Sequence, residues 1–371
     1  MTPRVGFVLE RSLGHTSHAE TLTAHLPAET TIEAAVCQIT YEVEGKAAKV
    51  PVYRSDWTLR AGILARQGVR RMNRDGHLDA LFMHTQVPAV LCPDWMYRIP
   101  TVVSLDATPL QYDQLGDLYD HKIGNRWSEK AKWRANRACF RRARHVVTWS
   151  QWAMDGVVDG YDIAPDKITV LPPGVDPALW QPDSPGGGGG RTDGMLRILF
   201  VGGDLERKGG DVLLAAFEEL QTELDPERRW LALDLVTRAD VPERPGVRVH
   251  GGMSPNSPAL VALYHEADMF VLPTRADCLG IALVEAGAAG LPLVSTAMAG
   301  IPEIVKKDDT GLVVPPGDRA ALVAALRELV EHPELRRRLG ASARDLVVRR
   351  FDATTNTHRL AEILAAVAAG S

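Results

Sequence analysis

Short apolar segments alternate with amphipathic helical segments along the chain, and this alternation constrains the fold more than any other feature. We expect strands of one sheet at Val5–Leu9, Thr101–Leu105 and His145–Trp149. We expect strands of a second sheet at Leu196–Val201, Leu231–Val236, Met269–Leu272 and Leu293–Ser295. Strands that alternate with helices form parallel sheets with helices packed on their faces. The sequence therefore predicts an α/β protein with two parallel sheets.

A glycine-rich segment separates the two predicted sheets. Residues 186–190 are five consecutive glycines, and prolines lie just before them. Because glycine loses the most conformational freedom on ordering, such a run predicts a linker or a loop. We expect a domain boundary here, with a first domain at 1–183, a linker at 184–195 and a second domain at 196–351.

The length and composition exclude several classes of function. The chain has 371 residues, of which 45% are hydrophobic and 24% charged, so it is long enough for two globular domains. A net charge of −5 gives no reason to expect nucleic acid as a partner. No apolar run approaches the roughly 20 residues of a membrane-spanning helix, and the first apolar run is too short for a signal peptide. Four scattered cysteines predict reduced thiols in a cytoplasmic protein.

Residues 273–303 are the segment of the chain that is most informative about function. An apolar strand runs into a polar loop, and a helix begins near Ile281 and ends before Gly290. Backbone N–H groups at the N-terminus of such a helix favour an anion. Asp277 and Glu285 flank this terminus, so two carboxylates lie beside the predicted anion site. The arrangement fits a pyrophosphate that carries a polyhydroxylated group, with N–H groups for the phosphates and carboxylates for the sugar hydroxyls.

A second glycine-rich loop follows the first strand of the second domain. It contains Gly202, Gly203, Arg207, Lys208 and Gly209, and a helix follows it. Glycines let a backbone approach a ligand closely, and Arg and Lys supply positive charge to a diphosphate. The alternative is that Arg207 and Lys208 are only solvated. The position after a strand, together with the carboxylate pair, favours the diphosphate site.

The segment around the two carboxylates resembles the nucleotide-sugar site of the retaining glycosyltransferase family 4. The signature of that family is two glutamates separated by seven residues, and Asp277 and Glu285 have this spacing with Asp in the first place. The match continues through 285–292, 299–305 and 310–316. In the phosphate loop of the family, an Arg usually follows the first Gly and a Lys precedes the last one. Lys208 matches this Lys, whereas Gly202-Gly203 stands where the Arg is expected.

The resemblance implies the GT-B fold, which is two Rossmann-like domains with parallel sheets facing across a cleft. It also implies that a C-terminal helix, about 352–371, returns to the first domain. The implied reaction moves a hexose-type sugar from a nucleotide-diphosphate sugar to a saccharide, a lipid-linked glycan or a small metabolite, with an α-linked product. The family usually works without a bound metal or cofactor, and the sequence contains no Asp-x-Asp metal pair.

The resemblance also implies roles for individual residues. Lys208 and Arg207 would bind the diphosphate, Asp277 the hydroxyls of the donor sugar, and Glu285 the ribose. Backbone groups would meet the phosphates, the sugar or the base at five further positions: Gly203, Gly251, Leu279, Gly280 and Ile281.

The first domain offers candidates for the acceptor side. Gly14, His15 and His18 lie where the family often has a glycine-bearing turn, and the two histidines could hydrogen-bond an acceptor. The alternative is a simple glycine turn with a Thr or Ser helix cap. Many members have a His at the end of the strand at 101–105, where this chain has Asp106. Asp106 is therefore our candidate for a catalytic polar group, and His84, which ends an earlier strand, is the alternative.

The segment 122–144 is strongly basic, with nine Lys or Arg and one acidic residue. A basic helix with tryptophans could dock on anionic lipid on the inner face of a membrane. The alternative, which we favour, is a solvated helix that precedes a strand.

Two other functions remain open. A non-catalytic nucleotide-sugar-binding protein is supported by Asp277, by the missing loop Arg and by the missing strand-end His. A GT-B enzyme of another reaction, such as an epimerase or a phosphorylase, would share the fold but should lack the carboxylate pair.

Overall fold

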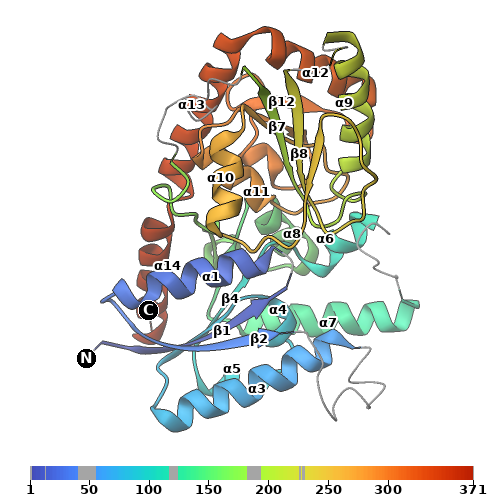
Figure 1. Ribbon diagram of the computed structural model, residues 1–371. Coiled ribbons are helices and arrows are strands. Elements are labelled where there is room, and N and C mark those ends of the chain that lie inside the picture. Colours follow the sequence, from blue (N-terminus) through green and yellow to red (C-terminus); the bar gives the residue numbers. More distant parts are fainter. Residues whose placement is uncertain are drawn as a thin grey trace. The chain divides into compact units, whose positions relative to one another are not determined.

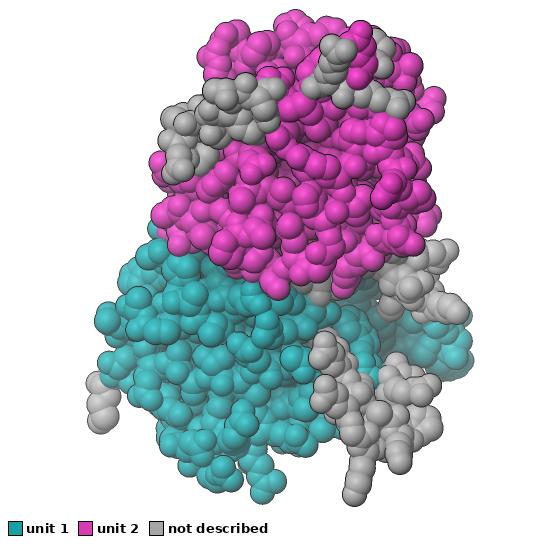
Figure 2. All heavy atoms as spheres, in the orientation of Figure 1, with its two compact units in different colours: residues 1–116, 121–174, 353–371 teal, residues 117–120, 175–352 magenta. Residues whose placement is uncertain are grey.

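The computed structural model describes residues 2–12, 14–40, 56–116, 124–181, 194–224, 227 and 230–370. The chain forms two compact units (Figures 1 and 2). Unit 1 comprises residues 1–116, 121–174 and 353–371, and unit 2 comprises the rest of the chain.

Unit 1 is built on a parallel sheet of six strands in the order β2-β1-β3-β4-β5-β6. The strands are β1 (Arg4–Arg11), β2 (Glu33–Thr40), β3 (Ala80–Met83), β4 (Thr101–Leu105), β5 (His145–Thr148) and β6 (Ile168–Val170). The predicted strands of the first sheet are confirmed. β2 and β6 were not predicted, because β2 is largely exposed at the edge of the sheet and β6 has only three residues.

Helices cover both faces of this sheet (Figure 1). They are α1 (His15–His25), α3 (Trp57–Asp75), α4 (Gln86–Ala89), α5 (Pro93–Arg98), α6 (Pro109–Gln114), α7 (Arg126–Arg142), α8 (Gln151–Tyr161) and α14 (Ala353–Ala368). Side chains alternate along β1, so Phe7 packs with Leu22 of α1 and Leu364 of α14, while Val8 packs in the opposite core with Val69 of α3. The C-terminal helix thus completes one of the two cores of unit 1.

Unit 2 is built on a second parallel sheet of six strands in the order β12-β11-β10-β7-β8-β9. The strands are β7 (Leu196–Val201), β8 (Leu231–Val236), β9 (Val247–His250), β10 (Met269–Leu272), β11 (Leu293–Thr296) and β12 (Gly311–Val314). The main helices are α9 (Gly210–Leu224), α10 (Pro258–Glu266), α11 (Ile281–Ala288), α12 (Arg319–Glu331) and α13 (Pro333–Arg350). The predicted fold class, two parallel sheets with helices, is confirmed.

Each sheet has a point at which the strand order reverses. In unit 1 the chain goes from β1 to β2 on one side and returns to β3 on the other side of β1. In unit 2 it goes from β7 to β8 and β9 and returns to β10 on the other side of β7. Open α/β sheets bind ligands outside the carboxyl ends of the strands at such a reversal. The loops after β1 and β3, and those after β7 and β10, are therefore the places to look for a site.

The two units divide after Gly174 and again after Asp352. Residues 175–181, which we expected in the first domain, pack in unit 2. The Trp180 ring lies 4.9 Å from that of Tyr264, and the Arg344 guanidinium donates to Gln181 Oε1 at 2.8 Å. Residues 182–193, which include most of the predicted linker at 184–195, lie outside the described residues. No helix in the described part of the chain is long and apolar enough to cross a membrane.

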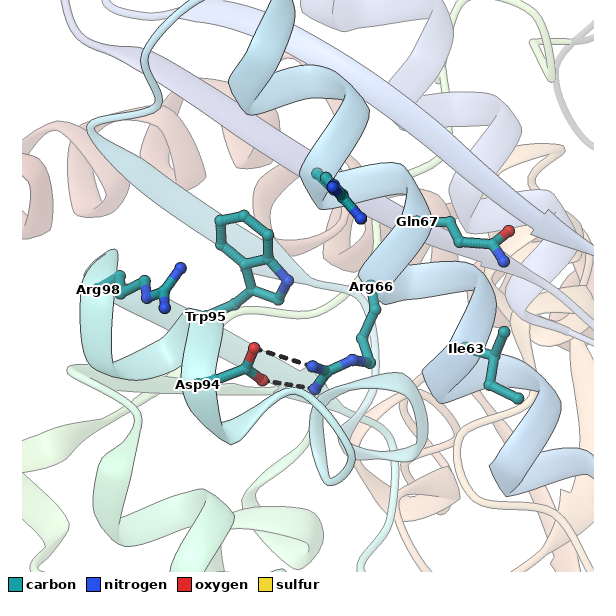
Figure 3. A pocket seen from close by; sticks show the side chains of 7 residues that line it. Ile63, Arg66, Gln67, Asp94, Trp95 and Arg98 are labelled. Carbon is teal, nitrogen blue, oxygen red and sulfur yellow. Dashed lines mark hydrogen bonds and ion pairs between the residues drawn. The ribbon is translucent and has the colours of Figure 1, made fainter.

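A cavity of about 520 Å³ lies between α3 and α5 of unit 1 (Figure 3). Arg66 of α3 forms a bidentate ion pair with Asp94, with N–O distances of 2.5 and 2.9 Å. The Arg98 guanidinium lies 5.8 Å from the centre of the Trp95 ring. None of the residues that the sequence predicts for the functional site lines this cavity.

Candidate active site

The glycine-rich loop after β7 and the loop after β10 are joined to each other at the strand-order reversal of unit 2. The Arg207 carbonyl oxygen accepts hydrogen bonds from the Arg275 amide at 2.9 Å and from Thr274 Oγ1 at 3.1 Å. The Arg207 guanidinium donates back to the carbonyl oxygen of Ala276 at 2.8 Å. The two loops that carry the predicted diphosphate and sugar residues therefore form one hydrogen-bonded structure.

Lys208 and Asp277 meet across these two loops. Lys208 Nζ donates a hydrogen bond to Asp277 Oδ2, and both side chains are largely buried. Helix α11 begins at Ile281 with Gly280 at its N-cap and has no side-chain cap, so Asp277 is not a capping residue. The structure brings together the cation of the glycine-rich loop and the first carboxylate of the predicted pair.

Arg207 lies beside this pair, but its guanidinium is already engaged. It bonds the Ala276 carbonyl and forms an ion pair with Asp204 at 3.3 Å. These contacts stabilise the conformation of the glycine-rich loop. The geometry therefore supports a structural role for Arg207 in addition to the predicted contact with diphosphate.

Gly209 is required where the two loops approach most closely. Its φ is +75°, and a Cβ at this position would lie 2.1 Å from the carbonyl oxygen of Pro273. No side chain can be accommodated without moving the backbone of the neighbouring loop.

We predict that Gly209→Ala destabilises the protein by more than about 2 kcal/mol, because φ strain and a backbone collision add together. The matched control is Gly317→Ala, which has the same φ of +75° but no atom within 4 Å of its Cβ. The control should lose only about 1 kcal/mol. Urea unfolding measures both variants, and equal losses would contradict the collision.

Glu285, the second carboxylate, lies in the second turn of α11 and is buried. Its Oε2 accepts a hydrogen bond from the Tyr264 hydroxyl at 2.8 Å. Burial raises the pKa of Glu285 to about 7, although the Tyr264 hydrogen bond acts in the opposite direction. Oε1 receives no hydrogen bond from the residues that the structure describes, so one carboxylate oxygen is left for a ligand.

The N-terminus of α11 lies between the two carboxylates. Gly280 adopts φ +79°, and Leu279 beside it is buried. The carbonyl of Cys278 accepts from the Gly300 amide at 2.8 Å, which ties this loop to the next matched segment. No side chain caps α11, so the N-terminus of this helix, starting at Ile281, could bind an anion.

Two further glycines of the prediction follow β7 and β9, which lie on either side of β8. Gly251 follows β9, and a Cβ there would meet no atom within 4 Å. Gly203 follows β7, and a Cβ there would lie 2.9 Å from Nε of Arg238. Arg238 was not predicted. It is the second residue after an apolar strand, which is the one local signal that could have identified it.

The loops of unit 1 gather three histidines around Trp149 at the other strand-order reversal. His15 and His18 come from α1, and His84 follows β3. Their rings lie 4.8, 5.0 and 5.8 Å from the Trp149 ring, respectively. His15 Nδ1, His18 Nδ1 and His84 Nε2 are buried without a hydrogen-bond partner among the described residues. Buried polar atoms of this kind usually have a hydrogen-bond partner, which can be a water molecule or a ligand.

Asp106 joins this cluster from the end of β4. His15 Nε2 lies 3.4 Å from Asp106 Oδ2, and the Tyr112 hydroxyl donates to the same oxygen at 2.9 Å. Burial lowers the pKa of His15, but the Asp106 carboxylate outweighs it and raises the pKa to about 9. Burial and the charge of His15 lower the pKa of His18 to about 3. The directions of these pKa shifts favour an imidazolium at His15 beside neutral rings at His18 and at His84, whose pKa burial also lowers.

Gly14 is the N-cap of α1, and the helix has no side-chain cap. The alternative that a Thr or Ser caps this helix is therefore wrong, because α1 already begins at His15, before Thr16 and Ser17. Leu13, which precedes the turn, lies outside the described residues.

We predict that Asp106→Asn lowers the pKa of His15 from about 9, because burial is then opposed only by the charge of Glu10. A raised His pKa stabilises the fold below about pH 6.5, and this stabilisation is lost as the pH rises through 9. The stability difference between wild type and variant should shrink over that range. NMR titration of the imidazole measures the pKa, and exposed His358, paired with Glu29 at 3.0 Å, is the internal control. An unchanged His15 titration would contradict the pairing.

Two family models match the chain, one on each side of the glycine run. Glycosyltransferase Family 4 matches residues 14–179, and Glycosyl transferases group 1 matches residues 190–346. Two solved structures share the fold. Sucrose-phosphate synthase from Thermosynechococcus elongatus has a TM-score of 0.74 at 17% identity and 100% coverage of both chains. HepE of Anabaena, in complex with UDP and glucose, has a TM-score of 0.69 at 16% identity, with 98% of this chain and 100% of that chain covered.

Proteins with similar sequences support the same family assignment as the two family models. D-inositol 3-phosphate glycosyltransferase of Corynebacterium aurimucosum is 32% identical over 54% of this chain and 51% of its own length. Glycogen synthase of Mycobacterium tuberculosis is 29% identical over 85% of this chain and 76% of its own length. The chain thus spans about half the length of the first of these relatives. It belongs to glycosyltransferase family 4, among the group 1 glycosyl transferases, and has the GT-B fold.

Proposed function

We propose that the chain is a retaining glycosyltransferase, which moves a hexose-type sugar from a nucleotide-diphosphate sugar to an acceptor and forms an α-glycosidic bond. The observation that carries this proposal is the pairing of Lys208 with Asp277 at the β7/β10 reversal, beside the uncapped N-terminus of α11. A cation, a carboxylate and oriented amides within one pair of loops suit a diphosphate attached to a sugar.

In the proposed reaction, the protein stabilises charge at the leaving group. Lys208 and the first amides of α11 bind the diphosphate, with Arg207 in contact or bracing the loop. Asp277 holds the sugar hydroxyls, Glu285 accepts from the ribose, and the backbone at Gly203 and Gly251 contacts phosphate and base. Donors aimed at developing negative charge are usually the largest contribution to catalysis. The donor phosphate would take the acceptor proton on the same face of the sugar.

The histidine cluster of unit 1 is the proposed acceptor side. Gly14 leaves open space, and His15 and His18 present unpartnered nitrogens. The imidazolium of His15, held by Asp106, suits an acceptor oxygen or an anionic group. The relatives named for inositol 3-phosphate and for glycogen support a saccharide or a cyclitol phosphate as acceptor, and the complex of HepE with UDP-glucose supports UDP-glucose as donor.

Independence of a metal is part of the proposal. Among the described residues, no group of three or more His, Cys, Asp or Glu could hold a metal ion. Adding EDTA should leave the rate unchanged, and a rate restored only by Mg²⁺ or Mn²⁺ would contradict this prediction.

A peripheral membrane contact in the cytoplasm, through α7, stays a prediction. Lys122 lies outside the described residues. Several described residues of α7 are engaged within unit 1: Lys132 pairs with Asp113 at 3.3 Å, Arg137 pairs with Asp162 at 2.6 Å, and Trp133 Nε1 donates to the Gly160 carbonyl at 2.9 Å. Trp127 is 82% exposed. The internal contacts support the solvated helix, whereas exposed Trp127 and the exposed basic residues Arg126, Lys130 and Arg134 support docking.

The experiment that tests the proposal starts from donor binding. Thermal shifts with UDP, GDP and ADP should identify the base, because a ligand at about 100 times its Kd stabilises by roughly 2.7 kcal/mol. Incubation with the matching nucleotide sugars should then give slow donor hydrolysis, and transfer when an acceptor is added. An NMR spectrum of the anomeric proton decides the configuration, and a product of inverted configuration would overturn the proposal. Binding of donors without any turnover would favour the non-catalytic alternative.

A further inference from the structure

The phosphate loop of this chain lacks the arginine that the family resemblance leads us to expect, and its two glycines differ in what surrounds them. A Cβ on Gly202 would lie 2.8 Å from a ring atom of Phe200 and 3.0 Å from Cβ of Lys208. A Cβ on Gly203 would have the Arg238 guanidinium as its nearest neighbour, at 2.9 Å from Nε and 3.1 Å from Nη2. The space beside Gly203 is therefore occupied by a guanidinium that comes from another strand.

The sheet brings this guanidinium to the loop. Arg238 follows β8, which pairs in parallel with β7, so both strands end at the same edge. The Gly202 amide donates to the Val236 carbonyl at 2.9 Å, which fixes the two strand ends against each other. Arg238 thus lies next to the loop that carries Lys208, although 30 residues separate them in sequence.

The side chain of Arg238 is exposed, and it makes no hydrogen bond or ion pair with any described residue. The nearby arginines, in contrast, form ion pairs with carboxylates. Arg275 forms a bidentate ion pair with Asp211, and Arg248 pairs with Asp234 at 2.6 Å. An uncompensated guanidinium at a ligand-binding sheet edge is available for a bidentate contact with phosphate oxygens.

We propose that Arg238 binds the donor diphosphate in place of the missing loop arginine, and that residue 203 is glycine because the guanidinium needs the space above it. This inference rests on the proposed glycosyl transfer. In that reaction the bond between the anomeric carbon and the diphosphate oxygen breaks, and its electron pair stays on the oxygen. The acceptor oxygen bonds to the anomeric carbon and gives its proton to the departing diphosphate. Arg238 keeps its proton and stabilises the charge that develops.

Arg238→Gln tests the proposal. It should weaken binding of the nucleoside diphosphate by about 10- to 100-fold, as expected for lost hydrogen bonds to a charged group. Binding of the corresponding nucleoside should not change, and kcat should fall with the loss of leaving-group stabilisation. The matched control is Arg244→Gln, which removes an equal charge from the other end of the sheet, where Arg244 precedes β9 and pairs with Glu218 at 3.6 Å. The control should bind and turn over like wild type.

Moving the arginine from position 238 to position 203 tests the proposal in a second way. Gly203→Arg alone should impair diphosphate binding, because the new side chain takes the space of the Arg238 guanidinium and displaces it. Gly203→Arg combined with Arg238→Gln should recover at least tenfold of the affinity that Arg238→Gln loses, since an arginine again lies beside the diphosphate. Gly203 does not require a positive φ, so the backbone accepts a side chain. Thermal unfolding of each variant establishes that it is folded.

The outcomes separate this inference from the function on which it rests. If wild type binds and hydrolyses a nucleotide sugar but Arg238→Gln equals wild type, the inference is wrong and the proposed function stands. If Arg238→Gln weakens nucleoside and nucleoside diphosphate equally, Arg238 shapes the pocket and does not bind phosphate. If wild type binds no nucleoside diphosphate, both proposals are wrong.

Discussion

Replacing Lys208 by methionine is expected to lower kcat for glycosyl transfer by about 10²- to 10³-fold, the size of effect seen when one preorganised donor to developing charge is removed. Lys208 Nζ lies at the junction of the two loops, on Asp277 and beside the N-terminus of α11. No other lysine lies in either loop, 202–209 or 273–280. Steady-state kinetics with the donor found by thermal shift measures the effect.

The control for this variant is Lys307→Met, which removes an exposed lysine of the same unit and should leave kcat unchanged. Lys208→Arg should retain part of the rate, because a guanidinium supplies charge but not the same reach. A Lys208→Met enzyme that is folded and turns over like wild type would remove Lys208 from the diphosphate site.

Replacing Glu285 by glutamine is expected to weaken nucleotide binding by about 10- to 100-fold, since hydrogen bonds to a carboxylate are stronger than those to a neutral amide. The pKa of Glu285, raised by burial to about 7, adds a pH dependence. Nucleotide affinity of wild type should rise between pH 6 and pH 8 as the carboxyl group ionises. The variant should show no such rise. Isothermal titration calorimetry over this range measures both effects.

The stability of the wild-type fold should fall over the pH range in which its nucleotide affinity rises. A carboxyl pKa raised above its unfolded value of 4.5 stabilises the fold fully at lower pH, and this stability is lost as the pH rises through about 7. Glu285→Gln should therefore unfold at a higher temperature than wild type at pH 8, with a smaller gain at pH 5. Exposed Glu331→Gln of α12 is the control and should change neither property. Equal pH profiles of binding for wild type and Glu285→Gln would exclude Glu285 as a ligand to the nucleotide.

Local sequence was enough to identify the strands that are buried on both faces. β4, β7, β8 and β10 begin and end at the residues that the apolar runs indicate. The strands that were missed lie at the edges of the sheets or are short. β9, for example, has no fully buried residue in its burial pattern and so carries no apolar run. Hydrophobic pattern reports burial, so it cannot report a strand that is held mainly by backbone hydrogen bonds.

The sequence by itself also identified the candidate groups of the proposed donor site, because Asp277, Glu285 and Lys208 lie in short motifs after apolar strands. Only the tertiary structure decided what these groups contact. The strand order places β10 on one side of β7 and β8 on the other, so Lys208 reaches Asp277 and Arg238 reaches Gly203. In unit 1 the same effect brings His84 and Asp106 to His15. Pairing between parallel strands is a contact between distant parts of the chain, and no local pattern of residues encodes which strand ends become neighbours.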